Sequence, residues 1–135
     1  MSLDQAAIDR LAAAPVAPGR LLIEGQWQTG EGGENPVLSP IDGQQLTTLA
    51  AASPADVARA CASARAAFED GRWSRLAPAA RKAVLHRLAD LIERDAAELA
   101  VLGVRDNGTE ISMALKAEPG SAATTFRYYA EALDK

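Results

Sequence analysis

The sequence predicts short β-strands in roughly the first fifty residues and α-helices in the rest, an order that on its own indicates a small α+β domain. Two turn signals, Glu24-Gly25 and Asp42-Gly43, separate short extended stretches. A helix-capping pattern begins at Ser53, and apolar residues recur beyond it at intervals of three and four. We therefore expect two or three short strands followed by three helices.

The amino-terminal stretch, residues 1–20, is rich in alanine and contains Pro15 and Pro18, which end any helix. We expect a flexible arm or a short helix there, separate from residues 21–135. Glycine at the Glu24-Gly25 turn supplies the positive φ that a tight hairpin requires, so residues 20–28 should form two short extended pieces around it.

Two further extended stretches should follow a loop. Residues 29–36 are rich in glycine and end in Asn-Pro, which predicts a loop. Val37 and Leu38 should form a short strand that Ser39-Pro40 ends. The Asp42-Gly43 turn should then lead into a further strand over about residues 45–51.

The first predicted helix begins with the segment S-P-A-D. Ser53 is a cap residue, Pro54 suits the first helical position, and Asp56 stands where a capping box places an acidic side chain. We expect the helix to end near Glu69, before Asp70-Gly71. Its apolar face would carry Val57, Cys61, Ala64 and Phe68.

Two further helices are predicted after it. One begins at Pro78 and keeps helical spacing over about twenty residues, with Val84, Leu88, Leu91, Ile92, Leu99 and Leu102 on its apolar face. The other begins at Glu118-Pro119 and carries Phe126, Tyr129 and Leu133.

Composition and charge limit the classes of function. A net charge of −4 argues against nucleic-acid binding, which needs clustered Lys and Arg. The single cysteine cannot form an internal disulfide, and no apolar stretch approaches the ~20 residues of a membrane span. The amino terminus carries Asp4, Asp9 and Arg10 rather than an apolar segment, so it does not resemble a secretory signal. We expect a cytoplasmic protein that binds neither nucleic acid nor membrane.

Four motifs give the chain a family resemblance. They are S-P-I-D-G at residues 39–43, the stretch W-S-R-L-A-P-A-A-R-K-A-V-L-H-R-L-A-D-L-I-E-R at residues 73–94, D-N-G at residues 106–108 and F-R-Y-Y-A-E-A-L-D-K at residues 126–135. Together they resemble the amino-terminal region of the NAD(P)-dependent aldehyde dehydrogenases, collinearly from about Leu21 onward. The segments L-K-A-E-P-G-S-A-A and A-E-A-L-D-K are most similar to dehydrogenases of γ-glutamyl-γ-aminobutyraldehyde and other amino-aldehydes.

The resemblance changes the expected fold class from α+β to α/β. It implies that residues 21–135 are a partial segment of the cofactor domain, with short strands and three helices that cover a doubly wound sheet mostly absent from this chain. The complete enzyme would oxidise an aldehyde to a carboxylate through a cysteine, with a glutamate base and NAD or NADP as hydride acceptor. In the family these catalytic and cofactor-binding residues lie in later sequence. We therefore expect no catalytic residue and no bound NAD or NADP in this chain alone.

Three features that could suggest chemistry have simpler explanations. Cys61 lies between Val57 and Phe68 on an apolar helix face, so a buried structural thiol is favoured over a nucleophile. His86 should be a solvated residue beside Asp90 and Glu93, since no nucleophile accompanies it. The cluster G-E-G-G at residues 30–33 precedes a strand rather than a helix, which argues against a phosphate-binding loop.

Asp106 is the strongest candidate for a binding residue. The resemblance implies a structural Na⁺ or K⁺ near this aspartate, with main-chain oxygens of Val37 and Leu38 as further ligands, and hard cations do prefer such oxygens. A helix-ending turn at Asn107-Gly108 without an ion explains the motif equally well. Both interpretations stay open. The family often has D-x-G-K-P here, whereas this chain continues with Thr109 and Glu110.

Ala117 and Ser121 fall where family members place side chains at the mouth of the aldehyde tunnel. Both are small here, which implies a wide entrance in the complete enzyme. The alternative explanation is that they are ordinary residues at the start of a helix.

The large apolar faces of the second and third predicted helices would lack a partner within this chain. We expect them to be covered by the remainder of the enzyme or by self-association into an oligomer. The alternative is a stand-alone helical module that binds another protein through the same faces. In a structure, exposed large apolar side chains on these helices would favour the first interpretation.

Overall fold

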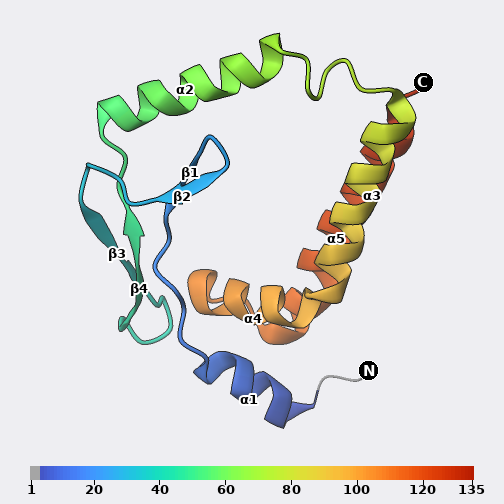
Figure 1. Cartoon of the computed structure of the whole chain (residues 1–135). Helices are drawn as coiled ribbons and strands as arrows, with labels where there is room; N and C mark the ends of the chain where they lie inside the picture. Colours follow the sequence, from blue (N-terminus) through green and yellow to red (C-terminus); the bar gives the residue numbers. More distant parts are fainter. Residues whose placement is uncertain (1–3) are drawn as a thin grey trace. The chain divides into compact units, whose positions relative to one another are not determined.

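The computed structural model describes residues 4–135, which form four β-strands and five α-helices (Figure 1). They divide into two compact units. The strand unit comprises residues 15–38 and 43–76, and the helix unit comprises residues 4–14, 39–42 and 77–135. None of the helices in the described part is long and apolar enough to cross a membrane.

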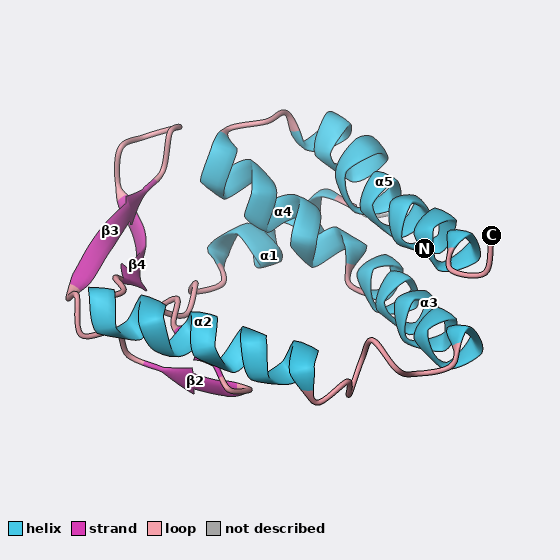
Figure 2. Ribbon diagram, turned by 90° about the horizontal axis from the view of Figure 1, so that it is seen from above, coloured by secondary structure: helices cyan, strands magenta, loops and turns pink. Residues whose placement is uncertain are grey.

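The strand unit contains two antiparallel strand pairs, drawn in magenta in Figure 2. β1 (Leu21–Ile23) and β2 (Gln26–Gln28) form the predicted hairpin, in which Glu24 and Gly25 have φ of 56° and 74°. β3 (Glu34–Leu38) pairs with β4 (Gln45–Ala50). β3 therefore begins within the predicted loop, because its main chain pairs with β4 despite Pro36, which an edge strand tolerates.

The first predicted helix is α2 (Pro54–Glu69), and its start is confirmed in detail. The Asp56 N–H donates to Ser53 Oγ over 3.1 Å, and the Ser53 N–H donates to Asp56 Oδ2 over 2.8 Å. These two bonds form a capping box, in which each side chain binds the main chain of the other residue.

The helix unit contains α1 (Gln5–Ala13), α3 (Pro78–Arg94), α4 (Ala96–Asn107) and α5 (Ile111–Ala132). α1 shows that the amino-terminal stretch includes a short helix, and Asp4 caps it by accepting from the Ala7 N–H over 2.8 Å. α3 and α5 lie side by side, and α4 follows α3 and packs against α5 (Figures 1 and 2).

Two predicted helix boundaries in this unit are wrong. The second predicted helix is divided into α3 and α4 at Asp95, whose backbone leaves the helical region at φ −99° and ψ 14°. α5 begins seven residues before Glu118, with Glu110 as its cap residue, so Pro119 lies inside the helix. A helix this long can lose the hydrogen bond that proline cannot donate, and Pro119 is itself buried against the rest of the unit.

Alanines, rather than large apolar residues, form the buried contact of α3 with α5. Ala89 of α3 and Ala123 and Ala130 of α5 are fully buried. Larger apolar residues of the predicted faces are exposed, among them Val84 at 51 % and Tyr129 at 60 %. Other residues of these faces, such as Leu91 and Phe126, are half-buried.

Candidate functional site

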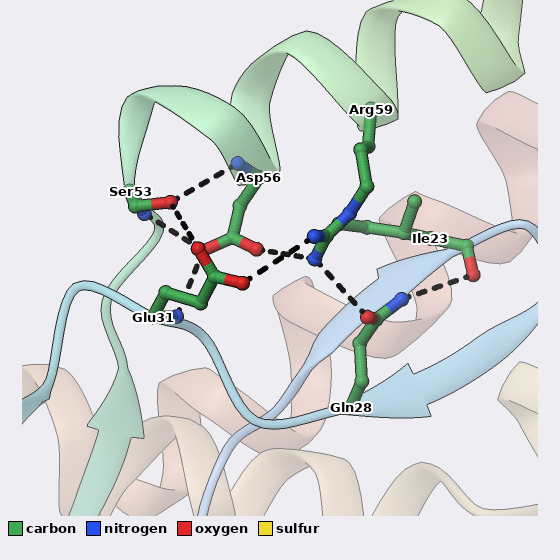
Figure 3. Close-up of polar contacts among 6 residues, drawn as sticks. All are labelled: Ile23, Gln28, Glu31, Ser53, Asp56 and Arg59. Atoms are coloured by element: carbon green, nitrogen blue, oxygen red, sulfur yellow. Dashed lines mark hydrogen bonds and ion pairs between the residues drawn. The ribbon is translucent and has the colours of Figure 1, made fainter.

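Asp56, at the start of α2, is a buried carboxylate whose oxygens bind three other residues of the strand unit (Figure 3). Its Oδ2 atom accepts from the N–H groups of Ser53 and Glu31, both over 2.8 Å. Its Oδ1 atom accepts from Arg59 Nη2 over 2.5 Å, although the residue has no exposed surface. These hydrogen bonds, with that of Ser53 first, lower the pKa of the Asp56 carboxyl below its ordinary value.

Arg59 extends this network to the β1–β2 hairpin. Its Nη2 atom also donates to Gln28 Oε1 over 3.4 Å, and Gln28 Nε2 donates to the Ile23 carbonyl over 3.5 Å. Glu31 contributes an ion pair with Arg59 at 3.6 Å. One buried carboxylate thus connects α2, the loop after β2 and the hairpin.

The glycine cluster is explained by the same junction. The Gly32 N–H donates to the Ala51 carbonyl over 3.0 Å, and a Cβ atom on Gly30 would lie 2.0 Å from that oxygen. Because the N–H groups of Glu31 and Gly32 already bind protein acceptors, this loop has few donors left for a phosphate. Close packing against Ala51 therefore accounts for two of the three glycines.

The predicted burial of Cys61 is wrong. Its thiol is exposed, as are Val57 and Phe68 on the same face of α2. The described residues of the strand unit cover mainly the side of α2 that faces β1, so the apolar face predicted from the helical period has no covering element here.

His86 is half-buried rather than fully solvated. Its side chain is 39 % exposed, and Nε2 lies 2.9 Å from Glu131 Oε1 on α5. The predicted neighbours Asp90 and Glu93 bind Arg127 instead. The sequence could not reveal this pairing, because α3 and α5 are far apart along the chain.

Two reciprocal ion-pair clusters, which the sequence did not indicate, join α3 to α5. Lys82 of α3 binds Glu131 and Asp134, both at 2.9 Å. Arg127 of α5 binds Asp90 and Glu93 of α3, the former at 2.9 Å. Their one detectable signal was pairs of acidic residues three apart, Asp90 with Glu93 in α3 and Glu131 of α5 with Asp134 just after it, a pattern also typical of solvated surfaces.

Asp106 lies exposed in the last turn of α4, and the predicted helix-ending turn after it is confirmed. Gly108 adopts φ 77°, and the Thr109 N–H donates to Asn107 Oδ1 over 2.7 Å. Val37 and Leu38 lie on β3, in the other unit. Among residues 4–135, no three His, Cys, Asp or Glu side chains cluster as metal ligands, and the cation site stays a prediction.

Ala117 and Ser121 are one helical turn apart on α5 and are both exposed. Their spacing places them on one face of the helix. Thr125, the next residue at this interval, is also exposed. Their part in an aldehyde entrance stays a prediction.

Comparisons with known proteins agree on one family. The sequence model of the aldehyde dehydrogenase family matches residues 27–135. The cytosolic 10-formyltetrahydrofolate dehydrogenase of Xenopus laevis is 40 % identical over 119 residues, which are 87 % of this chain and 13 % of that protein.

Solved structures extend the similarity to the fold. A P. syringae indole-3-acetaldehyde dehydrogenase in complex with NAD⁺ matches 98 % of this chain and 27 % of its own, with a TM-score of 0.92 and 39 % identity. The γ-glutamyl-γ-aminobutyraldehyde dehydrogenase of Burkholderia cenocepacia matches 96 % of this chain and 27 % of its own, with a TM-score of 0.90 and 39 % identity.

The chain thus spans about a quarter of the length of these solved dehydrogenases and less of the first relative. The short strands and helices of the chain superpose on the solved dehydrogenases, so the chain is an α/β segment. The chain belongs to the aldehyde dehydrogenase family, and it corresponds to the amino-terminal part of that family.

Proposed function

We propose that the chain is the amino-terminal segment of an oxidoreductase that converts an aldehyde to a carboxylate and reduces NAD⁺ or NADP⁺. The observation that carries this proposal is the superposition of 98 % of the chain on an NAD⁺-bound dehydrogenase. In the complete enzyme that we propose, the nicotinamide cofactor would accept a hydride from the aldehyde substrate. This chain would contribute outer helices and first strands, and the bonds of its glycine-rich loop to Asp56 and Ala51 support this structural role.

A segment exchange tests the proposal. Residues 27–135 would replace the matching segment of the Burkholderia cenocepacia γ-glutamyl-γ-aminobutyraldehyde dehydrogenase. We expect the chimera to keep aldehyde-dependent reduction of NAD⁺, while this chain alone shows none above background. A folded chimera without NAD⁺ reduction, or turnover by this chain alone that Cys61→Ala abolishes, would contradict the proposal.

Asp106, with the main-chain oxygens of Val37 and Leu38, is our proposed site for Na⁺ or K⁺. One contact within the helix unit supports it: Pro40, two residues after Leu38, packs against Gly108, two residues after Asp106. Oxygen ligands suit both cations. The chimera should melt at a higher temperature in K⁺ or Na⁺ than in a tetramethylammonium salt of equal ionic strength, and Asp106→Asn should remove that difference. An unchanged difference in the variant would exclude Asp106 as a ligand.

Ala117 and Ser121 are our proposed residues at the substrate entrance, and amino-aldehydes are the proposed substrate class. The support is their exposure on one face of α5 and the similarity to a γ-glutamyl-γ-aminobutyraldehyde dehydrogenase. Ser121→Leu in the chimera should raise KM for a bulky aldehyde more than for a small one. Equal effects on both aldehydes would contradict this placement.

For the exposed apolar faces, the proposed partner is the remainder of the dehydrogenase, with self-association as the competing outcome. Relatives several times longer than the chain support this choice. The stand-alone interaction module gains no support from the exposed side chains or from the family match. Cytoplasmic location also remains our proposal, and one relative is a cytosolic enzyme.

A further inference from the structure

The Asp56 side chain connects the loop after β2 to the first turn of α2, and Arg59 extends this junction to the hairpin. The Oδ2 atom receives two main-chain N–H donors, from Glu31 in the loop and from Ser53 at the helix cap. The Oδ1 atom receives the Arg59 guanidinium. Because Asp56 has no exposed surface, water does not compete for these positions.

The charged groups that face Asp56 are few. Arg59 belongs to the same helix, and Glu31 belongs to the loop and also pairs with Arg59. β1, which packs against α2, carries only Leu21, Leu22 and Ile23. The positive charge that compensates the carboxylate is therefore Arg59 alone among the described residues, and the main-chain donors supply the remaining stabilisation.

Protonation of this carboxylate would weaken the hydrogen bonds that its two oxygens accept. A protonated carboxyl carries a hydrogen on one oxygen, and each oxygen here already faces at least one donor. One donor group would lose its acceptor, and the Arg59–Glu31 pair would have to carry the guanidinium charge. Because a buried N–H without an acceptor is costly, protonation favours separation of the loop from the helix cap.

We propose that Asp56 is an acid-sensitive latch of the strand unit. Ionised, it holds the loop at residues 30–33 against the first turn of α2. Protonated, it releases the Glu31 N–H from the first turn of α2, whereas the buried alanines of α3 and α5 do not depend on this carboxyl. The hydrogen bonds to the ionised form also keep its pKa below the ordinary 3.8, which agrees with this arrangement.

The direction of the pH effect follows from that lowered pKa. A group with a lowered pKa in the folded state stabilises the fold above its unfolded-state pKa. The stabilisation from Asp56 is therefore fully present above about pH 4 and is lost as the pH falls through the pKa of the folded state. The latch should be closed at neutral pH and open only in acid.

Amide hydrogen exchange of the full chain tests the proposal, with protection factors corrected for the intrinsic pH dependence of exchange. Between about pH 6 and pH 2, the Glu31 and Ser53 amides should lose protection by about tenfold or more, as expected when a hydrogen bond to a charged group is lost. Amides of α5 in the helix unit should lose less. Equal loss in both units would indicate general acid unfolding and would overturn the latch.

Two substitutions separate the latch from a purely structural role. Asp56→Asn keeps the shape but removes the charge, so the Glu31 amide should exchange quickly at pH 6 with little further change in acid. Asp70→Asn is the matched control, because the Asp70 carboxylate also binds a main-chain N–H and a guanidinium, those of Arg72, at an exposed position. It should leave the exchange of the Glu31 amide as it is in the original chain.

A second measurement keeps the proposal testable if Asp56→Asn does not fold. The ¹³C shift of the Asp56 carboxyl in the original chain reports its titration directly. Protection of the Glu31 amide should begin to fall below about pH 4 and should stop falling once the carboxyl has titrated. Retained protection after the carboxyl has titrated would overturn the proposal.

Discussion

Ser53 illustrates at the residue scale how a single hydroxyl defines where a helix begins. Its Oγ accepts the Asp56 N–H, one of the main-chain donors that the first turn of α2 cannot satisfy itself. Ser53→Ala should therefore lower the free energy of unfolding by about 0.5–2 kcal/mol in urea titrations. Ser63→Ala is the matched control inside α2, where alanine has the higher helix propensity, so it should leave stability unchanged or slightly raised. Equal losses would mean that the cap contributes nothing specific.

Cys61 provides a second test at this scale. Because the thiol is exposed, a thiol reagent should modify it in the folded chain at nearly the rate seen in denaturant. The Cys61→Ser variant is the control, because it has no cysteine and should not react with the reagent. A folded-state rate many times slower would show that the thiol is covered in solution, for example by self-association through α2.

At the element scale, buried alanines and two ion-pair clusters join α3 and α5. Arg127 hydrogen bonding lowers the pKa of Glu93, and Lys82 hydrogen bonding lowers the pKa of Asp134. Carboxyls with lowered pKa values stabilise the fold at neutral pH and lose that contribution as the pH falls below about 4. Arg127→Met should therefore lower the melting temperature at pH 7 and have a smaller effect near pH 3.

Arg87→Met is the control for that experiment, since Arg87 is an exposed arginine of α3. It should change the melting temperature little at either pH. High salt should reduce the effect of Arg127→Met at pH 7, because exposed ion pairs are screened. An Arg127→Met effect that is independent of both pH and salt would indicate lost packing of the arginine stem instead.

The sequence predicted local structure well and contacts between elements poorly. The hairpin at Glu24-Gly25, the cap at Ser53 and the turn at Gly108 were predictable, because each depends on neighbouring residues and on φ angles that glycine supplies. The break at Asp95 was hidden because apolar residues keep helical spacing on both sides of it. Pro119 suggested a helix start, yet packing within the unit maintains the helix through it.

The candidate site divides in the same way. Asp56 was recognised as a capping residue from its distance to Ser53, but its bond to Glu31 joins residues far apart in sequence. The ion pairs of Lys82 and Arg127 likewise depend on how α3 meets α5. Roles assigned to Asp106, Ala117 and Ser121 came from family resemblance, because an exposed aspartate or a small residue has no distinctive local signal.

At the scale of the whole molecule, exposed apolar side chains determine how the isolated chain should associate and bind apolar molecules. Val84 and Leu88 lie one turn apart on α3, and Leu99 on α4 is 42 % exposed. Fully burying one such side chain gains about 1.5–3 kcal/mol, so a partner that covers several of them is strongly favoured. The isolated chain should bind a hydrophobic dye and self-associate with rising concentration in sedimentation experiments.

Leu88→Glu should reduce both dye binding and self-association while leaving the helical circular dichroism unchanged, since Leu88 is partly exposed already. Lys116→Glu is the charge control, because it adds negative charge at an exposed polar position of α5 and removes no apolar side chain. It should leave dye binding as it is in the original chain. A monomeric chain that melts sharply and binds no dye would contradict the proposal that the remainder of an enzyme normally covers these faces.

The alanine contact between α3 and α5 has a consequence for how the two helices can be moved apart. With Ala89, Ala123 and Ala130 fully buried, side-chain volume at these three positions acts as a spacer between the helices. Enlarging one of them to valine or leucine would wedge the pair open, at a cost of about 1–3 kcal/mol from overpacking. A series of substitutions at Ala123 with side chains of increasing volume, from glycine to leucine, would thus increase the distance between α3 and α5 step by step. The exposed face of α5 would move outward while its own residues stay unchanged.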